Sequence, residues 1–196
     1  MKAFPSVANR QDLGRRGAWT FTREYVVEPE LTLVFHRLYE AAFAPLRVRS
    51  MARQVLTELE FAAQMSNGEI EKYVAWDLVG NPVGLCAMTR QLELVPWISP
   101  DYFAARYPQQ WERNAVWYLN FVLAHPSQRH SGFVDQLMEV GVGELIDQRA
   151  ICAYDMCAYN DDVLGLGRRL AQRFERATGA TPQLVDTQNY YAVSFV

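Results

Sequence analysis

The most informative part of the chain is residues 115–146, AVWYLNFVLAHPSQRHSGFVDQLMEVGVGELI. Its first ten residues are apolar almost throughout, which is typical of a central strand covered on both faces. From Phe133 to Ile146 apolar residues recur at spacings of three and four, with acidic residues on the other side, which predicts an amphipathic helix. A short polar loop that contains Arg129 and Gly132 separates the two elements. The sequence therefore predicts a strand, a loop and a helix in direct succession.

The segments before this stretch also alternate between strand and helix. Residues 19–28 have the β-branched and aromatic content of a strand. A helix is predicted from Pro29, and a second helix from Ser50 to about residue 65. Residues 73–89, YVAWDLVGNPVGLCAMT, contain two strand-like runs around a Gly-Asn-Pro turn and predict a β-hairpin. Residues 1–18 precede this pattern, and we interpret them as an N-terminal extension.

The segments after the central stretch complete the expected fold. Residues 151–159, ICAYDMCAY, read as another strand, and a helix that stops at Gly179 follows it. Residues 183–196, QLVDTQNYYAVSFV, predict one or two final strands. The fold class is therefore α/β, with a mixed, mostly antiparallel central sheet flanked by helices. We expect residues 19–196 to form a single domain.

Composition limits the classes of function and location. Nineteen Lys and Arg against twenty-two Asp and Glu give a net charge of -3, which disfavours a basic face for nucleic acid. Three cysteines are an odd number in a chain of this length, and this disfavours a disulfide framework. The opening residues lack the apolar run of a signal peptide, and no stretch is long enough for a membrane span. We therefore expect a cytoplasmic protein with neither nucleic acid nor membrane as a partner.

The polar loop before the predicted helix has the features of an anion site. The first amides of a helix lack acceptors within the helix, and the helix dipole attracts negative charge to that end. Gly132 allows a backbone conformation or a close approach that a Cβ would obstruct, and Arg129 could donate to a phosphate oxygen. A pyrophosphate is the ligand that this arrangement favours.

The same loop carries a resemblance to a known family. Residues 124–132, AHPSQRHSG, are similar in register to the coenzyme A loop of the GNAT-type N-acetyltransferase superfamily, whose pattern is V-x-P-x-x-R-x-x-G-x-G/A. Residues 80–88, GNPVGLCAM, also resemble that family's hairpin. The resemblance in element order extends from about Trp19 to the C-terminus. It implies a GNAT-like acyl-CoA N-acyltransferase fold, with acetyl-CoA as cosubstrate and an amine as acceptor.

The resemblance also implies which residues contact the cosubstrate. They come from the end of the central strand, the loop, the first turn of the helix, and the asparagine that follows the next strand. These residues are Val122, Leu123, Ala124, Arg129, His130, Ser131, Gly132, Phe133, Val134 and Asn160.

The reaction that the resemblance implies is direct attack of a primary amine on the acetyl thioester. Regular strand alternation puts Tyr118, Asn120, Val122 and Ala124 on one face. Tyr118 and Asn120 stand where the family, when it has a catalytic carboxylate on this strand, usually carries it, so we take both as catalytic candidates that act by positioning or through water. Asp155 is a third candidate: buried in its strand it would have a raised pKa suited to a base, although a structural or exposed aspartate is the alternative.

Two departures from the family pattern keep other functions open. Val134 replaces the last small residue of the loop pattern, and Arg168 stands where the family often has a general-acid tyrosine. A module that binds CoA or acyl-CoA without turnover is therefore the second hypothesis, and a structural interaction domain with an empty cleft is the third. Cys152 and Cys157 are spaced so that they fall on opposite strand faces, so no metal site is expected.

A group of aromatic residues precedes the central strand. These side chains could wall an acceptor pocket or serve as the contact of a homodimer, and the sequence favours neither. The group consists of Trp97, Tyr102, Phe103, Tyr107 and Trp111.

Overall fold

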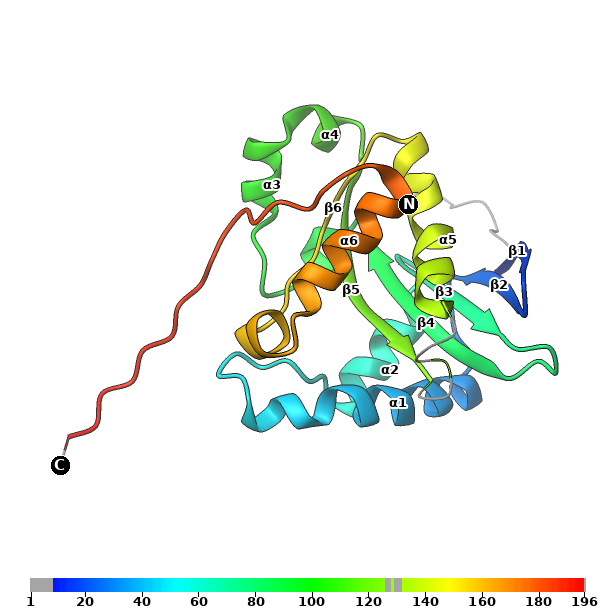
Figure 1. Cartoon of the computed structure of the whole chain (residues 1–196), viewed down its shortest axis with the longest axis horizontal. Helices are drawn as coiled ribbons and strands as arrows, with labels where there is room; N and C mark the ends of the chain where they lie inside the picture. Colours follow the sequence, from blue (N-terminus) through cyan, green and yellow to red (C-terminus); the bar gives the residue numbers. More distant parts are fainter. Residues whose placement is uncertain (1–8, 126–127, 129–131, 196) are drawn as a thin grey trace, which may run out of the picture. The chain divides into compact units, whose positions relative to one another are not determined.

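The computed structural model describes residues 9–125, 128 and 132–195. Within them, six strands form one sheet in the order β1-β2-β3-β4-β5-β6 (Figure 1). The pairs from β1 to β5 are antiparallel, and β6 runs parallel to β5. The predicted mixed, mostly antiparallel sheet is therefore confirmed. The strands are β1 (Arg10–Arg16), β2 (Trp19–Glu24), β3 (Ile70–Trp76), β4 (Pro82–Thr89), β5 (Val116–Ala124) and β6 (Ile151–Ala153).

The chain divides into two compact units. The sheet unit comprises Met1–Ala42 and Leu56–Asp155, and the second unit comprises Phe43–Val55 and Met156–Val196. The interpretation of residues 19–196 as one domain stays a prediction. The α-helices are α1 (Pro29–Phe43), α2 (Glu58–Ser66), α3 (Pro100–Arg106), α4 (Pro108–Glu112), α5 (Phe133–Asp147) and α6 (Leu166–Thr178).

The sheet is covered by α5 on one face and by α1 and α2 on the other. Gly84 faces α5, because a Cβ built on it would lie only 2.2 Å from Cζ of Phe133. Phe121 points to the opposite face, where its ring stacks on Phe61 of α2 and meets Tyr39 of α1 edge to face. Both faces of β4 and β5 are therefore buried, which explains their almost continuous apolar sequence.

The local signals of the sequence predict the hairpin correctly but misplace the start of α2. The predicted hairpin is formed by β3 and β4, and the backbone amides of Val79 and Asn81 bond to the carboxylate of Asp77 in its turn. The helix predicted from Ser50 begins instead at Glu58. Thr57 caps it, because the side chains of Thr57 and Glu60 each accept the backbone N–H of the other residue.

The interpretation of residues 1–18 as an extension omitted a strand. Residues Arg10–Arg16 form β1, which pairs with β2 and shifts register between Asp12 and Arg15. Nearly all of its residues are exposed on both faces, so the strand carries little of the apolar alternation by which strands are found.

The second unit contains two short helical turns and α6. Its turns are a 3-10 helix, Ala44–Val48, and a π-helical turn, Tyr159–Val163. The guanidinium of Arg49 lies 4.6 Å from the ring centre of Tyr159 and donates to its hydroxyl at 2.7 Å. This contact joins the two segments of the unit.

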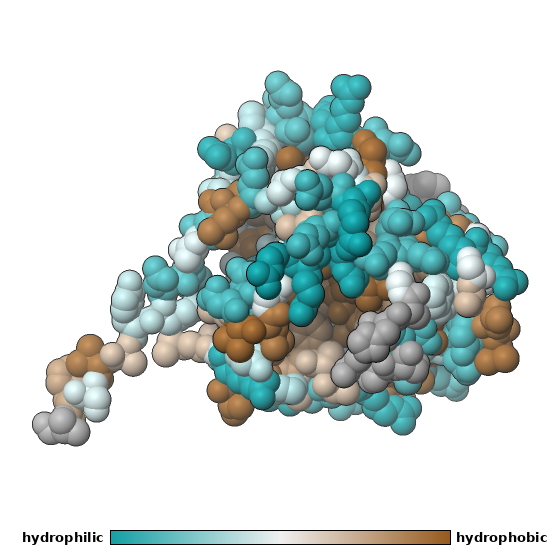
Figure 2. All heavy atoms as spheres, viewed as in Figure 1, coloured by the Kyte–Doolittle hydropathy of each residue, from teal (hydrophilic) through white to brown (hydrophobic). Residues whose placement is uncertain are grey.

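The final strands predicted for residues 183–196 are wrong for the described part of that segment. Residues 180–195 form neither helix nor strand, and the side chains of Leu184, Tyr191 and Phe195 are exposed. Figure 2 shows hydrophobic residues, in brown, at the surface of this extended segment. A strand needs a partner for its backbone groups, and alternating apolar residues do not supply one. No helix among the described residues is both long and apolar enough to cross a membrane.

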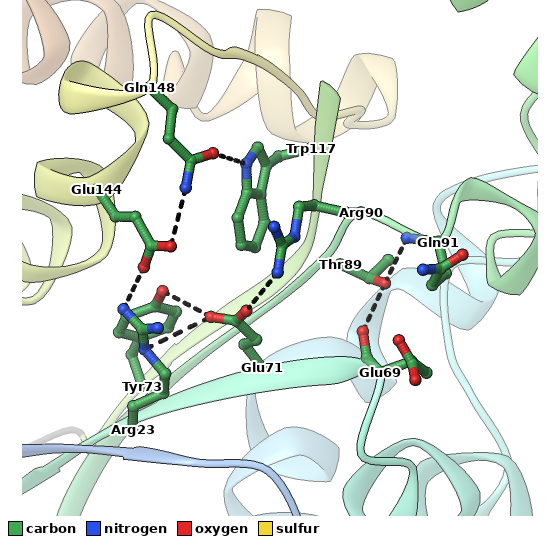
Figure 3. Close-up of polar contacts among 10 residues, drawn as sticks. All are labelled: Arg23, Glu69, Glu71, Tyr73, Thr89, Arg90, Gln91, Trp117, Glu144 and Gln148. Carbon is green, nitrogen blue, oxygen red and sulfur yellow. Dashed lines mark hydrogen bonds and ion pairs between the residues drawn. The ribbon is translucent and has the colours of Figure 1, made fainter. Parts of the chain in front are cut away.

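A buried polar network holds α5 against the sheet (Figure 3). Glu71 of β3 accepts a hydrogen bond from Tyr73 at 2.9 Å and lies 3.5 Å from Nε of Arg23. Arg23 also donates to Glu144 of α5, and Arg90 approaches Glu71 from the other side at 3.6 Å. Burial raises the pKa of Glu71, and the coulombic attraction of Arg23 opposes that rise. Because Arg23 contacts both carboxylates, it is the residue that links β2 and β3 to α5.

Candidate functional site

β6 pairs with only the first part of β5. The two strands pair only at Val116 with Ile151, Trp117 with Cys152, and Tyr118 with Ala153. Beyond Tyr118, β5 continues to Ala124 with no partner on that side among the described residues. The backbone groups along this part of the edge can therefore hydrogen bond to a ligand.

A β-bulge lies at the start of this open edge. On its other side β5 pairs Phe121 with Ala87 and Leu119 with Met88, so Asn120 is the extra residue. The extra residue of a bulge is left out of the ladder, and the strand bends there. A backbone N–H at such a point can polarise a carbonyl group.

The bulge corrects the predicted alternation along β5. Tyr118, Asn120, Val122 and Ala124 were expected on one face. Val122 and Ala124 pair with Cys86 and Gly84 and face α5, whereas the Asn120 amide bonds to α2 on the opposite face. One inserted residue shifts the period of two, so the residues before and after it do not share a face.

Tyr118 and Asp155 lie together, and Trp97 joins them. The Tyr118 hydroxyl donates to Oδ1 of Asp155, and the indole Nε1–H of Trp97 lies 3.0 Å from the Tyr118 oxygen and 3.2 Å from Oδ1 of Asp155. Asp155 was predicted within a strand, but β6 ends at Ala153 and Asp155 follows it. Asp155 is exposed, so the buried position that was expected for a catalytic base is wrong.

Tyr118 is a neutral hydrogen-bond donor. Burial, and secondarily the charge of Asp155 and its hydrogen bond, raise the pKa of Tyr118 well above its usual value. Its hydroxyl is therefore protonated at neutral pH and is not a proton acceptor. Its position is fixed by a core cluster of Leu92, Val95, Phe103, Val116 and Tyr118 itself.

One polar atom of the Asn120 side-chain amide has a hydrogen-bond partner, and the other has none among the described residues. Its Nδ2 donates to Oε1 of Gln64 in α2 at 3.2 Å. Its Oδ1 is buried and has no hydrogen-bond partner among the described residues. Buried acceptors are nearly always satisfied in folded proteins, so a ligand N–H is a suitable partner for this oxygen.

The start of α5 has the backbone conformation that its sequence predicts. Gly132 occupies the N-cap position with φ 73°, in the left-handed region, and no side chain caps the helix. No described atom lies within 4 Å of the position that a Cβ on Gly132 would take. The first-turn amides have no acceptors within the helix.

The structure tests only some of the predicted site. Arg129, His130 and Ser131 lie outside the described residues. Val122, Leu123, Ala124, Phe133 and Val134 flank the loop as β5 and α5, and Asn160 belongs to the second unit. The catalytic and cosubstrate roles stay predictions.

Sequence reasoning missed Gln64, which holds Asn120. A glutamine on a half-buried helix face has no pattern that marks it, because its partner comes from a strand 56 residues away. Trp97 was recognised as one of several aromatic residues, but its hydrogen bond to Asp155 was not, because it joins residues 58 apart.

Comparison with known proteins gives structural similarity only. No protein-family model and no curated protein sequence matches the chain. A ribosomal-protein-alanine N-acetyltransferase from Brucella melitensis biovar Abortus 2308 is 13% identical, with a TM-score of 0.49, over 91% of this chain and 99% of that one. An aminoglycoside acetyltransferase from an uncultured soil metagenomic sample, in complex with sisomicin, is 12% identical with a TM-score of 0.48, over 90% and 97%.

A third solved structure belongs to the same broad class of transferases. The ribosomal-protein-S18-alanine N-acetyltransferase from Escherichia coli is 13% identical with a TM-score of 0.46, and 76% of each chain is covered. The solved structures that this chain resembles thus include several acetyltransferases.

Proposed function

We propose that the chain transfers the acetyl group of acetyl-CoA to the nitrogen of an amine. One observation carries the proposal: β5 has a bulge and an open edge, and the helix that follows it in the chain begins without a side-chain cap at its N-cap residue. Asn120 begins the open edge of β5, and the same strand leads to Gly132 at the start of α5. Acetyl-CoA needs a free strand edge for its thioester and the N-terminus of a helix for its pyrophosphate.

The start of α5 suits the pyrophosphate of acetyl-CoA. The first-turn amides have no acceptors inside the helix, and Gly132, in the left-handed region at the N-cap, carries no side chain of its own there. Val134 follows as the second residue of the helix and does not fill the position of a Gly132 Cβ. These features support binding by backbone amides, to which Arg129 adds charge in the family pattern.

The open edge of β5 suits the acetyl group and the acceptor. The amine nitrogen attacks the carbonyl carbon, a C–N bond forms, the C–S bond breaks, and the nitrogen loses a proton while the thiolate takes one up. A backbone N–H at the bulge stabilises the charge on the carbonyl oxygen. Oδ1 of Asn120 accepts an N–H of the amine and orients its lone pair. Tyr118 holds Asp155 in place beside them.

Binding of acetyl-CoA, measured by calorimetry, tests the cosubstrate site. Gly132→Asp brings a negative charge to the phosphate position and should weaken binding by about tenfold or more, since the added carboxylate repels the phosphate. Gly132→Asn is the matched control, because asparagine has the same size, tolerates a positive φ and carries no charge. Equal affinities of the two variants would contradict the assignment.

Release of CoA thiol with a panel of amines tests the reaction itself. Turnover with at least one amine supports an acetyltransferase. Binding of acetyl-CoA without turnover favours the alternative of a CoA-binding module. A cytoplasmic location and a homodimer stay predictions from the sequence.

A further inference from the structure

Asp155 is a carboxylate without a cationic partner among the described residues. It accepts hydrogen bonds from two neutral donors, Tyr118 and Trp97, and both reach Oδ1. Its side chain is exposed and follows the end of β6. Hydrogen bonds from neutral donors fix the carboxylate but leave its charge uncompensated. The second oxygen, Oδ2, therefore remains for a cationic group.

Trp97 provides an aromatic surface beside this carboxylate. The indole is 48% exposed although its N–H is engaged, and its ring centre is 6.3 Å from that of Tyr118. Val95 and Ile98 on either side of it belong to or pack against the core cluster, so the segment is anchored. An exposed indole next to a carboxylate is a favourable pair for an ammonium group.

Asp155 and Trp97 lie beside Tyr118 of β5, the strand that carries the proposed acceptor site. Tyr118 is the last residue of β5 that pairs with β6, so Asp155 lies where the two strands part. Asn120 is two residues further along β5, at the bulge. The amine held at Asn120 and the ammonium held at Asp155 therefore lie near neighbouring positions of one strand, which a short aliphatic chain can span.

We propose that Asp155 and Trp97 form a subsite for a second ammonium group of the acceptor, so that the acceptor class is aliphatic diamines and polyamines. The proposal rests on the acetyl transfer proposed above. One amine of the acceptor is acetylated at Asn120, and the other is held by the carboxylate and the indole. Discrimination against monoamines then follows, because a methyl group in place of the ammonium leaves Asp155 unpaired.

Cadaverine and n-hexylamine are the matched probes, since they differ only by an ammonium in place of a terminal methyl. The wild-type chain should show a kcat/KM for cadaverine at least about tenfold above that for n-hexylamine. Asp155→Asn should remove most of this preference by raising KM for cadaverine. Trp97→Leu should reduce it by a smaller factor. Asp101→Asn, at an exposed aspartate of α3, is the control and should keep the full preference.

Calorimetric titration of cadaverine without acetyl-CoA separates this inference from the proposed function. Binding that Asp155→Asn weakens about tenfold and Asp101→Asn does not supports the subsite even if no acetyl transfer is found. Absence of cadaverine binding to the wild-type chain at millimolar concentration overturns it. An unchanged preference in Asp155→Asn overturns it as well, whereas failure to bind acetyl-CoA or to release thiol counts against the proposed function alone. Circular dichroism of each variant confirms that it is folded.

Discussion

Lys72 is a charged side chain enclosed entirely by the protein. Its exposed fraction is 0%, and its Nζ donates to the carbonyl oxygens of Tyr25 at 2.8 Å and Asn67 at 2.6 Å. It thus links the residue after β2 to the C-terminal cap of α2. Burial lowers the pKa of Lys72 to about 7 from an ordinary value of 10.5.

This burial makes stability depend on pH. Between the folded pKa and the unfolded pKa, the unfolded chain holds the Lys72 proton and the folded chain does not, so stability rises with pH. The stability that the folded chain has with Lys72 neutral is fully present above the unfolded pKa, and it is lost as the pH falls through the folded pKa of about 7. We expect the free energy of unfolding of the wild-type chain, relative to Lys72→Met, to increase from about pH 7 to pH 9. Urea denaturation at a series of pH values measures this difference, and a flat difference would contradict the expectation.

Asn120 gives a prediction about turnover. Asn120→Ala removes the unpartnered Oδ1 and should lower kcat by about a hundredfold, while the dissociation constant of acetyl-CoA changes little. Steady-state kinetics with an amine found by screening measures the first quantity, and calorimetry measures the second.

A substitution of Gln64 tests the same site, because Gln64 accepts the hydrogen bond of the Asn120 amide. Gln64→Ala leaves the Asn120 oxygen in place but removes the partner that orients its amide, so kcat should fall by a smaller factor. Full turnover of Asn120→Ala would exclude the residue from the acceptor site. A loss of melting temperature with unchanged kcat per folded molecule would assign Asn120 a packing role.

At the scale of elements, β4 and α5 pack closely against each other at Gly84. A Cβ on Gly84 would lie 2.2 Å from Cζ of Phe133 and 3.0 Å from the carbonyl oxygen of Leu123. Phe133 has an exposed fraction of 0% and meets Trp19 edge to face at 5.4 Å, so its ring has little room to move.

Gly84→Ala should therefore destabilise the fold by about 1–3 kcal/mol, the usual cost of forcing an extra group into a packed core. Gly143→Ala is the control, because nothing lies within 4 Å of its Cβ position and alanine favours a helix. Chemical denaturation of both variants measures the difference. Equal stability of Gly84→Ala and the wild-type chain would show that Phe133 can move aside.

The elements also show which features the sequence predicts and which it does not. Turn residues and the periodicity of α5 are local signals, so the hairpin and the helix after Gly132 were predicted correctly. The bulge at Asn120 leaves no such signal, because β5 is apolar on both faces and an inserted residue does not disturb its pattern. The association of Tyr118 with Asp155 depends on pairing between distant strands, which spacing in one sequence does not show.

At the scale of the whole molecule, the C-terminal segment is expected to contribute little to stability. Residues 180–195 form no helix or strand, and their large apolar side chains are exposed. Deletion of residues 181–196 should shift the melting temperature by less than about 2 °C, which corresponds to under roughly 1 kcal/mol. Thermal unfolding followed by circular dichroism measures the shift. A drop of more than about 5 °C would show that the segment packs in solution.

The two outer strands of the sheet differ from the inner ones in a way that bears on solubility. An unpaired strand edge invites another chain to add to it, and charged residues, irregular register and shortness all discourage such addition. β1 carries Arg10, Arg15 and Arg16 and an interrupted register, and β6 has only three residues. Addition of a strand from another molecule is thereby opposed at β1 and along β6, whereas Leu119 to Ala124 of β5, beyond the end of β6, form the part of the described sheet edge to which another chain could add.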